Sequence, residues 1–221
     1  MPDYASTLSR VEDYFDRSAT KVWERLTSDA PVSRIRQTVR EGRDTMRALM
    51  LSRMPADLTG MRILDAGCGA GQMTAEMAGR GADVVAVDIS PALVEIARSR
   101  LPAHLTDKVT FASGDMTGDH GRFDHVVAMD SLIYYDTDAI TAALHRLGAR
   151  TDGSVIFTVA PRTAFLMTFW TLGKLFPRSD RSPVMVPHAF ATLNTATQSR
   201  LTRVARVSRG FYISECLEYH P

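Results

Sequence analysis

Residues 62–90 read RILDAGCGAGQMTAEMAGRGADVVAVDIS and contain two short apolar runs, each of which ends in an aspartate. Asp65 follows the first run and Asp88 ends the second. Between them lie three glycines at alternate positions, Gly67, Gly69 and Gly71. Glycine at a strand-to-helix turn lets the backbone turn sharply and approach a ligand closely. The stretch therefore predicts a buried strand, a ligand-binding turn, a helix and a second buried strand.

Apolar runs and helical patterns alternate along the middle of the chain. The runs that read as strands are 61–67, 83–88, 108–115, 123–135 and 153–161, and the helical patterns between them are 71–81, 90–102 and 136–150. Apolar strands separated by helices predict a mostly parallel sheet that is covered on both faces. At the C-terminus, residues 202–220 read as two strands that join near Gly210, which predicts an antiparallel hairpin.

Two further segments lie outside this alternation. Residues 1–58 read as helical, with Ser33 as a helix N-cap and Pro55 closing the segment, and we expect them to form an N-terminal helical cap or lid. Residues 59–221 form the predicted main domain. Residues 162–190, most of which fit no strand–helix alternation, are expected to form a helical insertion after the fifth strand, on the substrate side.

Composition and charge disfavour several classes of protein. The chain has 221 residues, 45% of them hydrophobic, which suffices for a packed core. Its 26 basic and 25 acidic residues argue against a nucleic-acid-binding protein, which usually carries a basic excess. Cys68 and Cys216 are far apart in sequence and indicate a reducing, cytoplasmic setting rather than a disulfide framework. The sequence shows no signal core, membrane-spanning run or zinc-ligand spacing, so no metal ligands are predicted.

The acids at the predicted strand ends indicate which ligand the glycine turn binds. Asp88 is placed to bind both hydroxyls of a ribose, and Asp115, which ends the third strand in SGDM, is placed to reach an adenine amino group. Asp65 is expected near a positively charged amino-acid tail. A dinucleotide would require G-x-G-x-x-G spacing, whereas here the third glycine comes one place early and position 72 is Gln. S-adenosylmethionine (SAM), which has a sulfonium, an ammonium and a ribose but no phosphate, fits these acids better.

The motifs ILDAGCGAG and SGDM, the acid Asp88 and the terminal hairpin together resemble the class I SAM-dependent methyltransferase fold over about residues 60–221. The resemblance implies an α/β, Rossmann-like domain whose seven-stranded, mostly parallel sheet ends in an antiparallel hairpin. It also implies SAM as the cofactor. The predicted cofactor-binding residues are Asp65, Ala66, Gly67, Gly69, Gly71, Gln72, Asp88, Ile89, Asp115, Met116 and Asp130.

The residues say less about the methyl acceptor. No N-P-P-Y-type tetrad follows the fourth strand, where the chain reads MDSLIYYD, so an amide or base nitrogen is disfavoured. A carboxylate is already ionised at neutral pH and needs no strong general base. The predicted insertion joins apolar and aromatic side chains to arginines, which suits a large flat apolar ligand with peripheral carboxylates. A small helical cap with its arginines in solvent is the alternative interpretation.

Five stretches of the chain resemble the magnesium protoporphyrin IX O-methyltransferases of (bacterio)chlorophyll biosynthesis. They are YFDRSATKVWERL, VREGRD, AMDSLIYY, APRTAFLMTFWTLGKLFPRSDRSP and RVSRGFYISECLE, and the resemblance runs from about residue 10 to the end. It implies transfer of a methyl group from SAM to one propionate of Mg-protoporphyrin IX, which gives the monomethyl ester and S-adenosylhomocysteine (SAH). It also implies transient contact with the large porphyrin-binding subunit of Mg-chelatase and peripheral association with the photosynthetic membrane.

The same reading supplies the residues expected to act on the acceptor. We expect Tyr134, Arg162 and Tyr14 to serve catalysis, with Arg162 pairing a propionate and Tyr14 lying on the lid. The family often has His where this chain has Tyr134, so Tyr134 would orient the carboxylate by donating a hydrogen bond. The predicted substrate-binding residues are Tyr14, Phe15, Trp23, Tyr134, Arg162, Phe165, Phe169, Arg178 and Arg181.

Three other functions remain open at this point. The first is a SAM-dependent O-methyltransferase that acts on another apolar acid or on a quinone-type hydroxyl. The second is a non-catalytic protein of the same fold, such as a porphyrin carrier. The third is a nicotinamide oxidoreductase, which the glycine spacing and the terminal hairpin disfavour.

Overall fold

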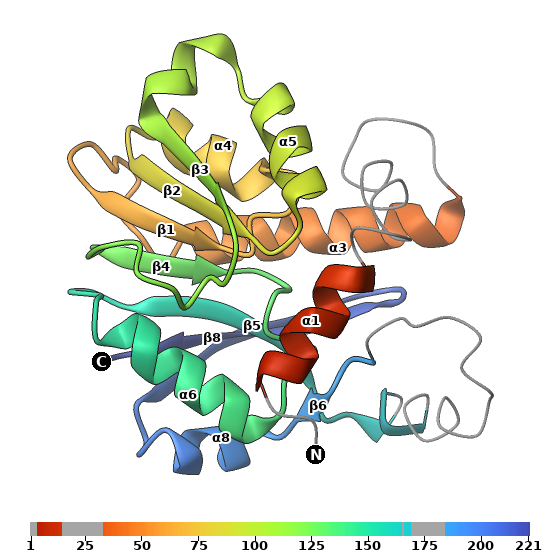
Figure 1. The fold of residues 1–221 in the computed structure, drawn as a ribbon. Coiled ribbons are helices and arrows are strands. Elements are labelled where there is room, and N and C mark those ends of the chain that lie inside the picture. The colour runs from red at the N-terminus through yellow and green to blue at the C-terminus, as the bar shows by residue number, and fades with distance from the viewer. Residues whose placement is uncertain (1–3, 15–32, 165, 169–183) are drawn as a thin grey trace.

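The computed structural model describes residues 4–14, 33–164, 166–168 and 184–221, whose helices and strands surround one mixed sheet (Figure 1). In chain order they are α1 (Tyr4–Tyr14), α3 (Arg34–Leu51), β1 (Arg62–Ala66), α4 (Gln72–Gly79), β2 (Asp83–Asp88), α5 (Pro91–Arg100), η2 (Ala103–Lys108), β3 (Val109–Ser113), β4 (His125–Ala128), α6 (Thr137–Gly148), β5 (Val155–Pro161), β6 (Pro187–His188), α8 (Phe190–Ala196), β7 (Leu201–Arg209) and β8 (Tyr212–Tyr219). The expected alternation of strands and helices in the middle of the chain is confirmed.

The sheet has the strand order β3-β2-β1-β4-β5-β8-β7, and the two-residue β6 pairs with β5 beside this path. Neighbouring strands from β3 to β5 run parallel, whereas β8 runs antiparallel to both β5 and β7. The predicted mostly parallel sheet with a terminal antiparallel hairpin is therefore confirmed. The order reverses beside β1, because the chain first adds β2 and β3 on one side and then β4 on the other. Open α/β sheets bind ligands outside the carboxyl ends of the strands at such a reversal.

Helices cover both faces of the sheet (Figure 1). On one face, α6 and α8 bury Leu144 and Leu193 in one apolar cluster with the strands. On the other face, α3 and α4 bury Met50 and Met77 in a second cluster. Burying a side chain of this size stabilises a fold by about 1.5–3 kcal/mol. Packing on both faces therefore holds the strand ends in fixed relative positions.

Helix α3 belongs to this core, although the sequence places it in an N-terminal cap. Ser33 is its N-cap, as predicted, and accepts a hydrogen bond from Arg36 N. A Cβ on Gly42 would lie 2.6 Å from Tyr212 Cδ1, so α3 approaches β8 more closely than a side chain would allow. The boundary at residue 58 between cap and main domain stays a prediction, but α3 is continuous with the core of the sheet.

The end of one strand and the presence of another differ clearly from the sequence prediction. The fourth strand was expected to continue to residue 135, but β4 ends at Ala128. Asp130 has a φ of 57° and its backbone N–H donates to Thr158 Oγ1 at 2.7 Å, so the chain leaves the sheet there. The predicted insertion also contains β6 (Pro187–His188), which is too short to show a strand pattern in the sequence.

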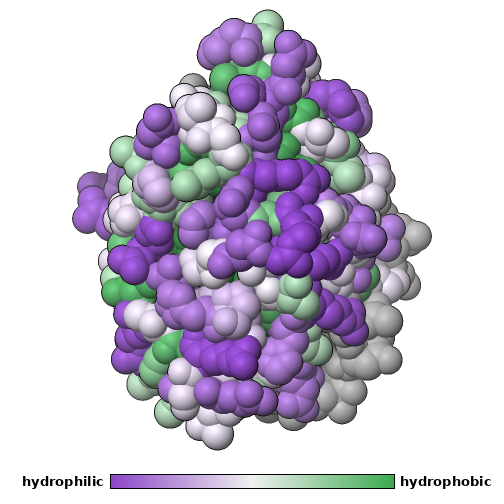
Figure 2. All heavy atoms as spheres, turned by 90° about the vertical axis from the view of Figure 1, so that its left-hand side faces the viewer, coloured by the Kyte–Doolittle hydropathy of each residue, from purple (hydrophilic) through white to green (hydrophobic). Residues whose placement is uncertain are grey.

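The starts of the parallel strands lie on the left in Figure 1, and that side faces the viewer in Figure 2. This face is mostly hydrophilic, with apolar residues scattered among charged ones (Figure 2). No helix in the described part of the chain is long and apolar enough to cross a bilayer. The acids singled out by the sequence lie at the opposite edge of the sheet, beside α1 (Figure 1).

Candidate active site

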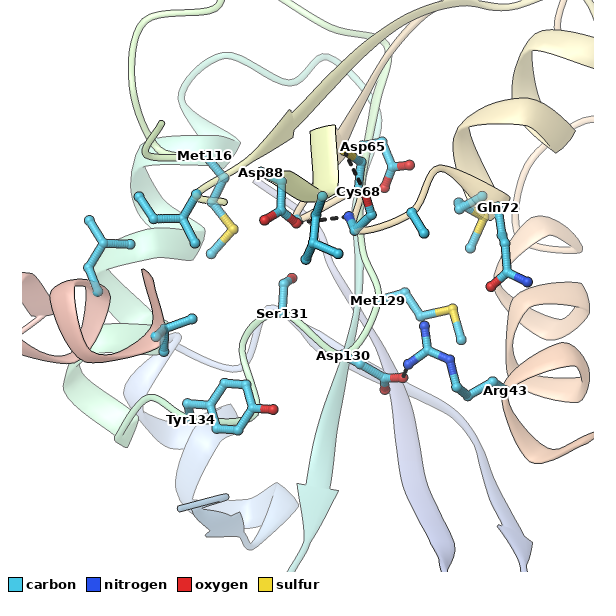
Figure 3. A pocket seen from close by; sticks show the side chains of 18 of the residues that line it. Arg43, Asp65, Cys68, Gln72, Asp88, Met116, Met129, Asp130, Ser131 and Tyr134 are labelled. Atoms are coloured by element: carbon cyan, nitrogen blue, oxygen red, sulfur yellow. Dashed lines mark hydrogen bonds and ion pairs between the residues drawn. The ribbon is translucent and has the colours of Figure 1, made fainter. Parts of the chain in front are cut away.

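A pocket lies at the carboxyl ends of β1, β2 and β4, and α1 and α3 contribute to its walls (Figure 3). Leu8 and Val11 line it from α1, and Arg43 and Arg47 line it from α3. The pocket contains about 970 Å³ of empty space, part of which is open to solvent.

The glycine turn after β1 forms one wall of the pocket, and its three glycines all have positive φ values. Gly67 and Gly69 line the pocket with φ values of 85° and 53°. A Cβ on Gly67 would lie 2.4 Å from the Cβ of Ser131, so a side chain there would collide with the opposite wall. Gly71 does not line the pocket and instead packs α4 against α5, where its Cβ would meet Ala97 Cβ at 2.9 Å. The predicted cofactor role of Gly71 is thus indirect.

Asp88, at the tip of β2, is held by the backbone of the glycine turn. Its Oδ2 accepts from Gly69 N at 2.8 Å and its Oδ1 accepts from Ser90 N at 3.0 Å. These bonds aim the carboxylate into the pocket, which it lines together with the neighbouring Ile89 (Figure 3). A carboxylate oxygen has two lone-pair sites, so an oxygen that accepts from a backbone N–H can also accept from a ligand hydroxyl.

Asp65, in β1, is almost completely buried at the floor of the pocket. Its Oδ2 accepts a hydrogen bond from Thr74 Oγ1 of α4. Burial raises the pKa of Asp65 to about 7, with a smaller contribution from the negative charge of Asp88 and with the bond from Thr74 opposing the shift. A positively charged ligand group nearby would favour the ionised form.

Asp130 follows β4 and is held by side chains from three other elements. Arg43 of α3 donates to Oδ2, and both the Tyr212 hydroxyl of β8 and Thr158 Oγ1 of β5 donate to Oδ1, at 3.1 and 3.2 Å. Burial raises the pKa of the Tyr212 phenol, so the phenol stays protonated and remains a donor. Figure 3 shows Arg43 and Asp130 side by side on the same side of the pocket. An arginine and a carboxylate are thus presented together to a ligand.

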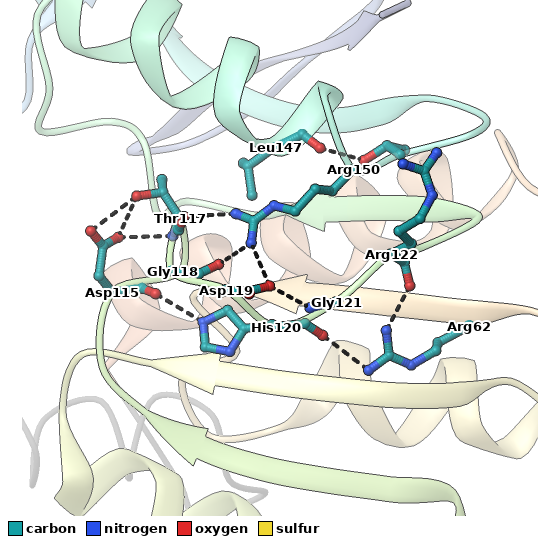
Figure 4. Close-up of polar contacts among 11 residues, drawn as sticks. Arg62, Asp115, Thr117, Gly118, Asp119, His120, Gly121, Arg122, Leu147 and Arg150 are labelled. Atoms are coloured by element: carbon teal, nitrogen blue, oxygen red, sulfur yellow. Dashed lines mark hydrogen bonds and ion pairs between the residues drawn. The ribbon is translucent and has the colours of Figure 1, made fainter.

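Local hydrogen bonds shape the loop that holds Asp115 at the end of β3 (Figure 4). The Asp115 carboxylate accepts from Thr117 N at 2.8 Å and from Thr117 Oγ1 at 2.9 Å, and it does not line the pocket. Gly114 and Met116, on either side of it, do line the pocket. Arg150 donates to the Thr117 carbonyl at 2.7 Å and so holds this loop from the end of α6. Gly114 and Met116 therefore reach the pocket from the end of this strand, Asp115 shapes the loop between them, and the predicted adenine contacts of Asp115 and Met116 stay predictions.

The turn after β4 forms the wall opposite the glycine turn. Ser131 Oγ donates to the carbonyl of Ala66 at 2.8 Å, so Ala66 acts through its backbone and ties the two walls together. Tyr134 and Tyr135 follow in this turn and line the pocket. Figure 3 shows Tyr134 across the pocket from Asp88. Tyr134, which is predicted to orient the methyl acceptor, thus lines the same pocket as Asp88.

Arg162 lies outside this pocket and is exposed. It lines a second cavity with Asp136, Thr137, Asp138, Met167, Val186, Pro187 and His188. The first pocket is lined as far as Tyr135 and the second begins at Asp136, so the two cavities are neighbours across one turn of the chain. The structure therefore separates two predicted catalytic residues, Tyr134 and Arg162, between adjoining cavities.

Several predicted substrate residues fall on parts of the chain that the structure does not describe. These residues are Phe15, Trp23, Phe165, Phe169, Arg178 and Arg181. Tyr14 ends α1, whose Leu8 and Val11 line the pocket, but the position of the Tyr14 side chain lies outside the description. Their roles stay predictions.

Arg43 and Arg47 of α3 and Tyr212 of β8 were not among the predicted site residues. Arg43 and Arg47 are four residues apart, so they share one face of α3 and both reach the pocket. Gln72, at the start of α4, lines the same region, as predicted. Helical spacing could have paired the two arginines, but no local pattern shows that their face meets Asp130.

The charges of the pocket suit SAM. Asp65 and Asp130 offer acceptors for an ammonium, Arg43 offers donors to a carboxylate, and Asp88 offers acceptors to ribose hydroxyls. A ligand with a pyrophosphate would place more negative charge among these acids. No cluster of three metal-binding side chains occurs in the described part of the chain.

Comparisons with known proteins agree with this geometry. Residues 63–151 match a family model described as a methyltransferase domain, and residues 128–221 match one described as the magnesium-protoporphyrin IX methyltransferase C-terminus. A magnesium-protoporphyrin O-methyltransferase of Rhodobacter capsulatus is 63% identical over 221 residues, which cover 99% of each chain.

Two crystal structures of magnesium protoporphyrin IX methyltransferase from Synechocystis PCC 6803 have the same fold. The structure with bound SAH superposes with a TM-score of 0.81 at 28% identity and covers 96% of this chain and 99% of that chain. The structure with bound SAM gives 0.78 at 25% identity and 97% of each chain. With its class I SAM-dependent fold and this identity over nearly all of both chains, the chain belongs to the magnesium-protoporphyrin O-methyltransferase family.

Proposed function

We propose that this pocket transfers a methyl group from SAM to a propionate carboxylate of Mg-protoporphyrin IX, which yields the monomethyl ester and SAH in (bacterio)chlorophyll biosynthesis. The observation that carries the proposal is the facing pair of walls at the sheet reversal. One wall carries the glycine turn and Asp88, and the other carries Tyr134 beside a second cavity with Arg162. Family membership supplies the acceptor, and the two walls supply places for both substrates.

The donor side divides among residues that suit each part of SAM. Asp88 accepts hydrogen bonds from the ribose hydroxyls, and Met116 packs on the adenine. Asp130 and Asp65 take the ammonium of the amino-acid tail, and Arg43 takes its carboxylate. Arg43 and Asp130 form an ion pair with each other, so they present a positive and a negative group side by side.

The transfer needs positioning more than it needs a base. SAM, when bound, supplies a methyl group on a positively charged sulfur. The propionate is ionised at neutral pH, so this chain has no proton to remove from it. Tyr134 donates a hydrogen bond that holds the carboxylate on the line of attack. Enclosure by the two walls removes water, and this favours a step in which opposite charges cancel.

The second cavity accommodates the rest of the acceptor. Mg-protoporphyrin IX has two propionates, and only one becomes the ester in this reaction. Arg162 binds the other propionate, because a guanidinium pairs well with a carboxylate and because Arg162 lines the cavity next to the pocket of Tyr134. This assignment keeps Arg162 on the acceptor, as the sequence predicts, but away from the reacting atoms.

The surface offers a place for partner contact. Ile35 and Phe211 are large apolar residues that stand exposed beside Arg36 and Arg209. Gly210 packs closely on Thr38, so the start of α3 and the hairpin form one surface. We assign transient contact with the large porphyrin-binding subunit of Mg-chelatase to this surface, in a cytoplasmic enzyme that is peripheral to the photosynthetic membrane.

Phe211→Ser should weaken co-elution of this chain with that subunit without changing its flotation with liposomes. Unchanged co-elution with weaker flotation would assign the surface to lipid.

Mass measurement of the product tests the proposed function. The chain is incubated with SAM and Mg-protoporphyrin IX, and the expected product is a porphyrin heavier by one methylene unit together with an equal amount of SAH. Mg-protoporphyrin IX dimethyl ester, which has no free carboxylate, should give no product. Methylation of a quinone-type phenol but not of the porphyrin would favour the alternative acceptor, and binding of both substrates without product would favour a carrier.

A further inference from the structure

A buried histidine links the two cavities and has no part in the chemistry described so far. His188, on β6, is 5% exposed and lines the second cavity. It lies 53 residues beyond Tyr135 in the sequence, and its ring contacts the turn that carries both pocket tyrosines. Buried polar side chains are costly unless they are hydrogen-bonded, so the partners of this ring show what it holds in place.

The ring of His188 bonds to the chain on both of its nitrogens. Nε2 lies 2.9 Å from the carbonyl oxygen of Tyr135. A carbonyl only accepts, so Nε2 carries the proton and donates it. Nδ1 lies 3.4 Å from Thr137 Oγ1, at the first residue of α6. Burial lowers the pKa of His188, although the bond to Tyr135 and the charge of Asp136 oppose the shift, and the neutral ring then accepts from Thr137 through Nδ1.

The backbone around His188 joins the same elements. The carbonyl of His188 accepts from Arg162 N at 2.7 Å, and Val186 N donates to the carbonyl of Ile133 at 2.8 Å. His188 also pairs with Pro161 in the parallel ladder of β5 and β6. β6 therefore connects the tyrosine turn to the end of β5, where Arg162 follows. The sequence alone shows none of these links, since β6 has two residues.

We propose that His188 is a positioning residue for the acceptor: it holds the turn of Tyr134 and Tyr135 at a set distance from Arg162, so that the reacting carboxylate meets the methyl group in line. The inference rests on the proposed function above. It adds His188 as the residue that fixes the position of the Tyr134 turn relative to Arg162. Misplacing reacting groups by about 1 Å costs about 100-fold in rate. Loss of the Nε2 bond also leaves the Tyr135 carbonyl without this donor, which favours a rearranged turn.

The test compares three substitutions at His188 with one matched control. His188→Leu removes both ring bonds, and His188→Asn keeps a polar group that is too short to reach Tyr135. His188→Gln keeps an N–H at about the position of Nε2. The control is His125→Leu, because His125 is half-buried and hydrogen-bonded to Ser154 at the start of β4, at the opposite edge of the sheet.

Four quantities are measured for each soluble variant: kcat, KM for Mg-protoporphyrin IX, Kd for SAH and Tm. We expect His188→Leu and His188→Asn to lower kcat by about tenfold or more, while the Kd for SAH stays within about twofold. His188→Gln should recover most of the lost kcat. His125→Leu should lower Tm without changing kcat below the unfolding temperature.

The pattern among the variants decides the inference. It is overturned if kcat of His188→Asn equals that of His188→Gln, if SAH affinity falls in parallel with kcat, or if His125→Leu loses as much kcat as the His188 variants. Because wild-type protein is measured first, failure of the proposed function would appear as absence of the methyl ester in wild type. Failure of this inference alone would leave wild type active and the His188 variants unchanged.

Discussion

The two walls of the pocket are built in different ways. The wall that faces SAM, the methyl donor, is called the donor wall, and the wall that faces the methyl acceptor is called the acceptor wall. The donor wall comes from residues 62–90, where Asp65, the glycine turn and Asp88 follow each other within one strand–helix–strand unit. The acceptor wall is assembled from distant pieces: the turn of Tyr134 after β4, His188 of β6 and the neighbouring cavity that Arg162 lines. The donor wall therefore depends on local backbone geometry, whereas the acceptor wall depends on how distant elements pack.

This difference predicts separate effects for substitutions on each wall. Changes on the donor wall should alter SAM binding and leave the porphyrin KM nearly unchanged. Changes on the acceptor wall should alter kcat or the porphyrin KM and leave SAM binding nearly unchanged. Arg43 comes from a distant helix but faces the expected position of the SAM tail. Its substitution therefore tests whether a residue outside residues 62–90 also contributes to SAM binding.

The largest effect is expected at Asp88. Asp88→Ala should weaken SAH binding by about 100-fold or more, because hydrogen bonds to a charged group contribute about 1.5–3 kcal/mol each. The variant also leaves Gly69 N and Ser90 N without their acceptor. Titration calorimetry measures the loss, and Asp83→Ala, at the exposed start of the same strand, is the control. Unchanged SAH affinity would remove Asp88 from the site.

A smaller effect is expected at Arg43, at the join between the walls. Arg43→Gln should weaken SAH binding by about tenfold, because a charge-assisted hydrogen bond to the tail carboxylate is lost. An SAH analogue that lacks the carboxylate should bind the wild type and the variant equally. The exposed Arg36→Gln serves as the control. If Arg43→Gln weakens the analogue as much as SAH, Arg43 acts only by holding Asp130.

On the acceptor wall, Arg162→Gln should raise the KM for Mg-protoporphyrin IX by several-fold to about tenfold and leave the KM for SAM unchanged. Steady-state kinetics with each substrate varied in turn measure both constants. Arg200→Gln, also exposed, should change neither. Equal increases in both KM values would argue against direct pairing of Arg162 with a propionate.

The smallest effect concerns the stability of the SAM-free protein. The pKa of Asp65 is about 7 in the fold, whereas a free aspartate has a pKa of about 3.9, so the folded state binds the proton more tightly than the unfolded state. Stability from the protonated form is fully present below about pH 4 and is lost as the pH rises through 7. The asparagine in Asp65→Asn cannot ionise, so the variant does not lose this stability as the pH rises. Its free energy of unfolding, relative to wild type, should rise by about 1 kcal/mol from pH 6 to pH 8.

Denaturant melts at the two pH values measure this difference for Asp65→Asn, with Asp83→Asn as the control. Asp83 is exposed at the start of β2, and its replacement should give the same difference from wild type at both pH values. A pH-independent difference for Asp65→Asn would show that Asp65 is already ionised in the SAM-free fold.

Most of the donor wall could be predicted from the sequence. The strand ends, the glycine turn and Asp88 follow from local patterns, because a buried strand and a tight turn each restrict the residues they contain. The resemblance over nearly the whole chain indicated the acceptor, which the residues alone left open. The fold and the family were confirmed by the structure and the comparisons.

The remaining features depend on contacts that no local pattern carries. Arg43 was missed because helical spacing shows which residues share a face of α3 but not what that face meets. The bond from Thr117 N to the Asp115 carboxylate, two residues apart, could not be read from the sequence, and the predicted contact of Asp115 with adenine stays a prediction. The fourth strand was predicted too long because the apolar run continues after Asp130 has turned the chain out of the sheet.

A crystal structure of this chain with SAH tests the central claim most directly. The account predicts ribose hydroxyls within hydrogen-bond distance of Asp88, the tail between Arg43 and Asp130, and the sulfur facing Tyr134. SAH bound away from the carboxyl ends of β1 and β2, or with its sulfur turned away from Tyr134, would contradict the account.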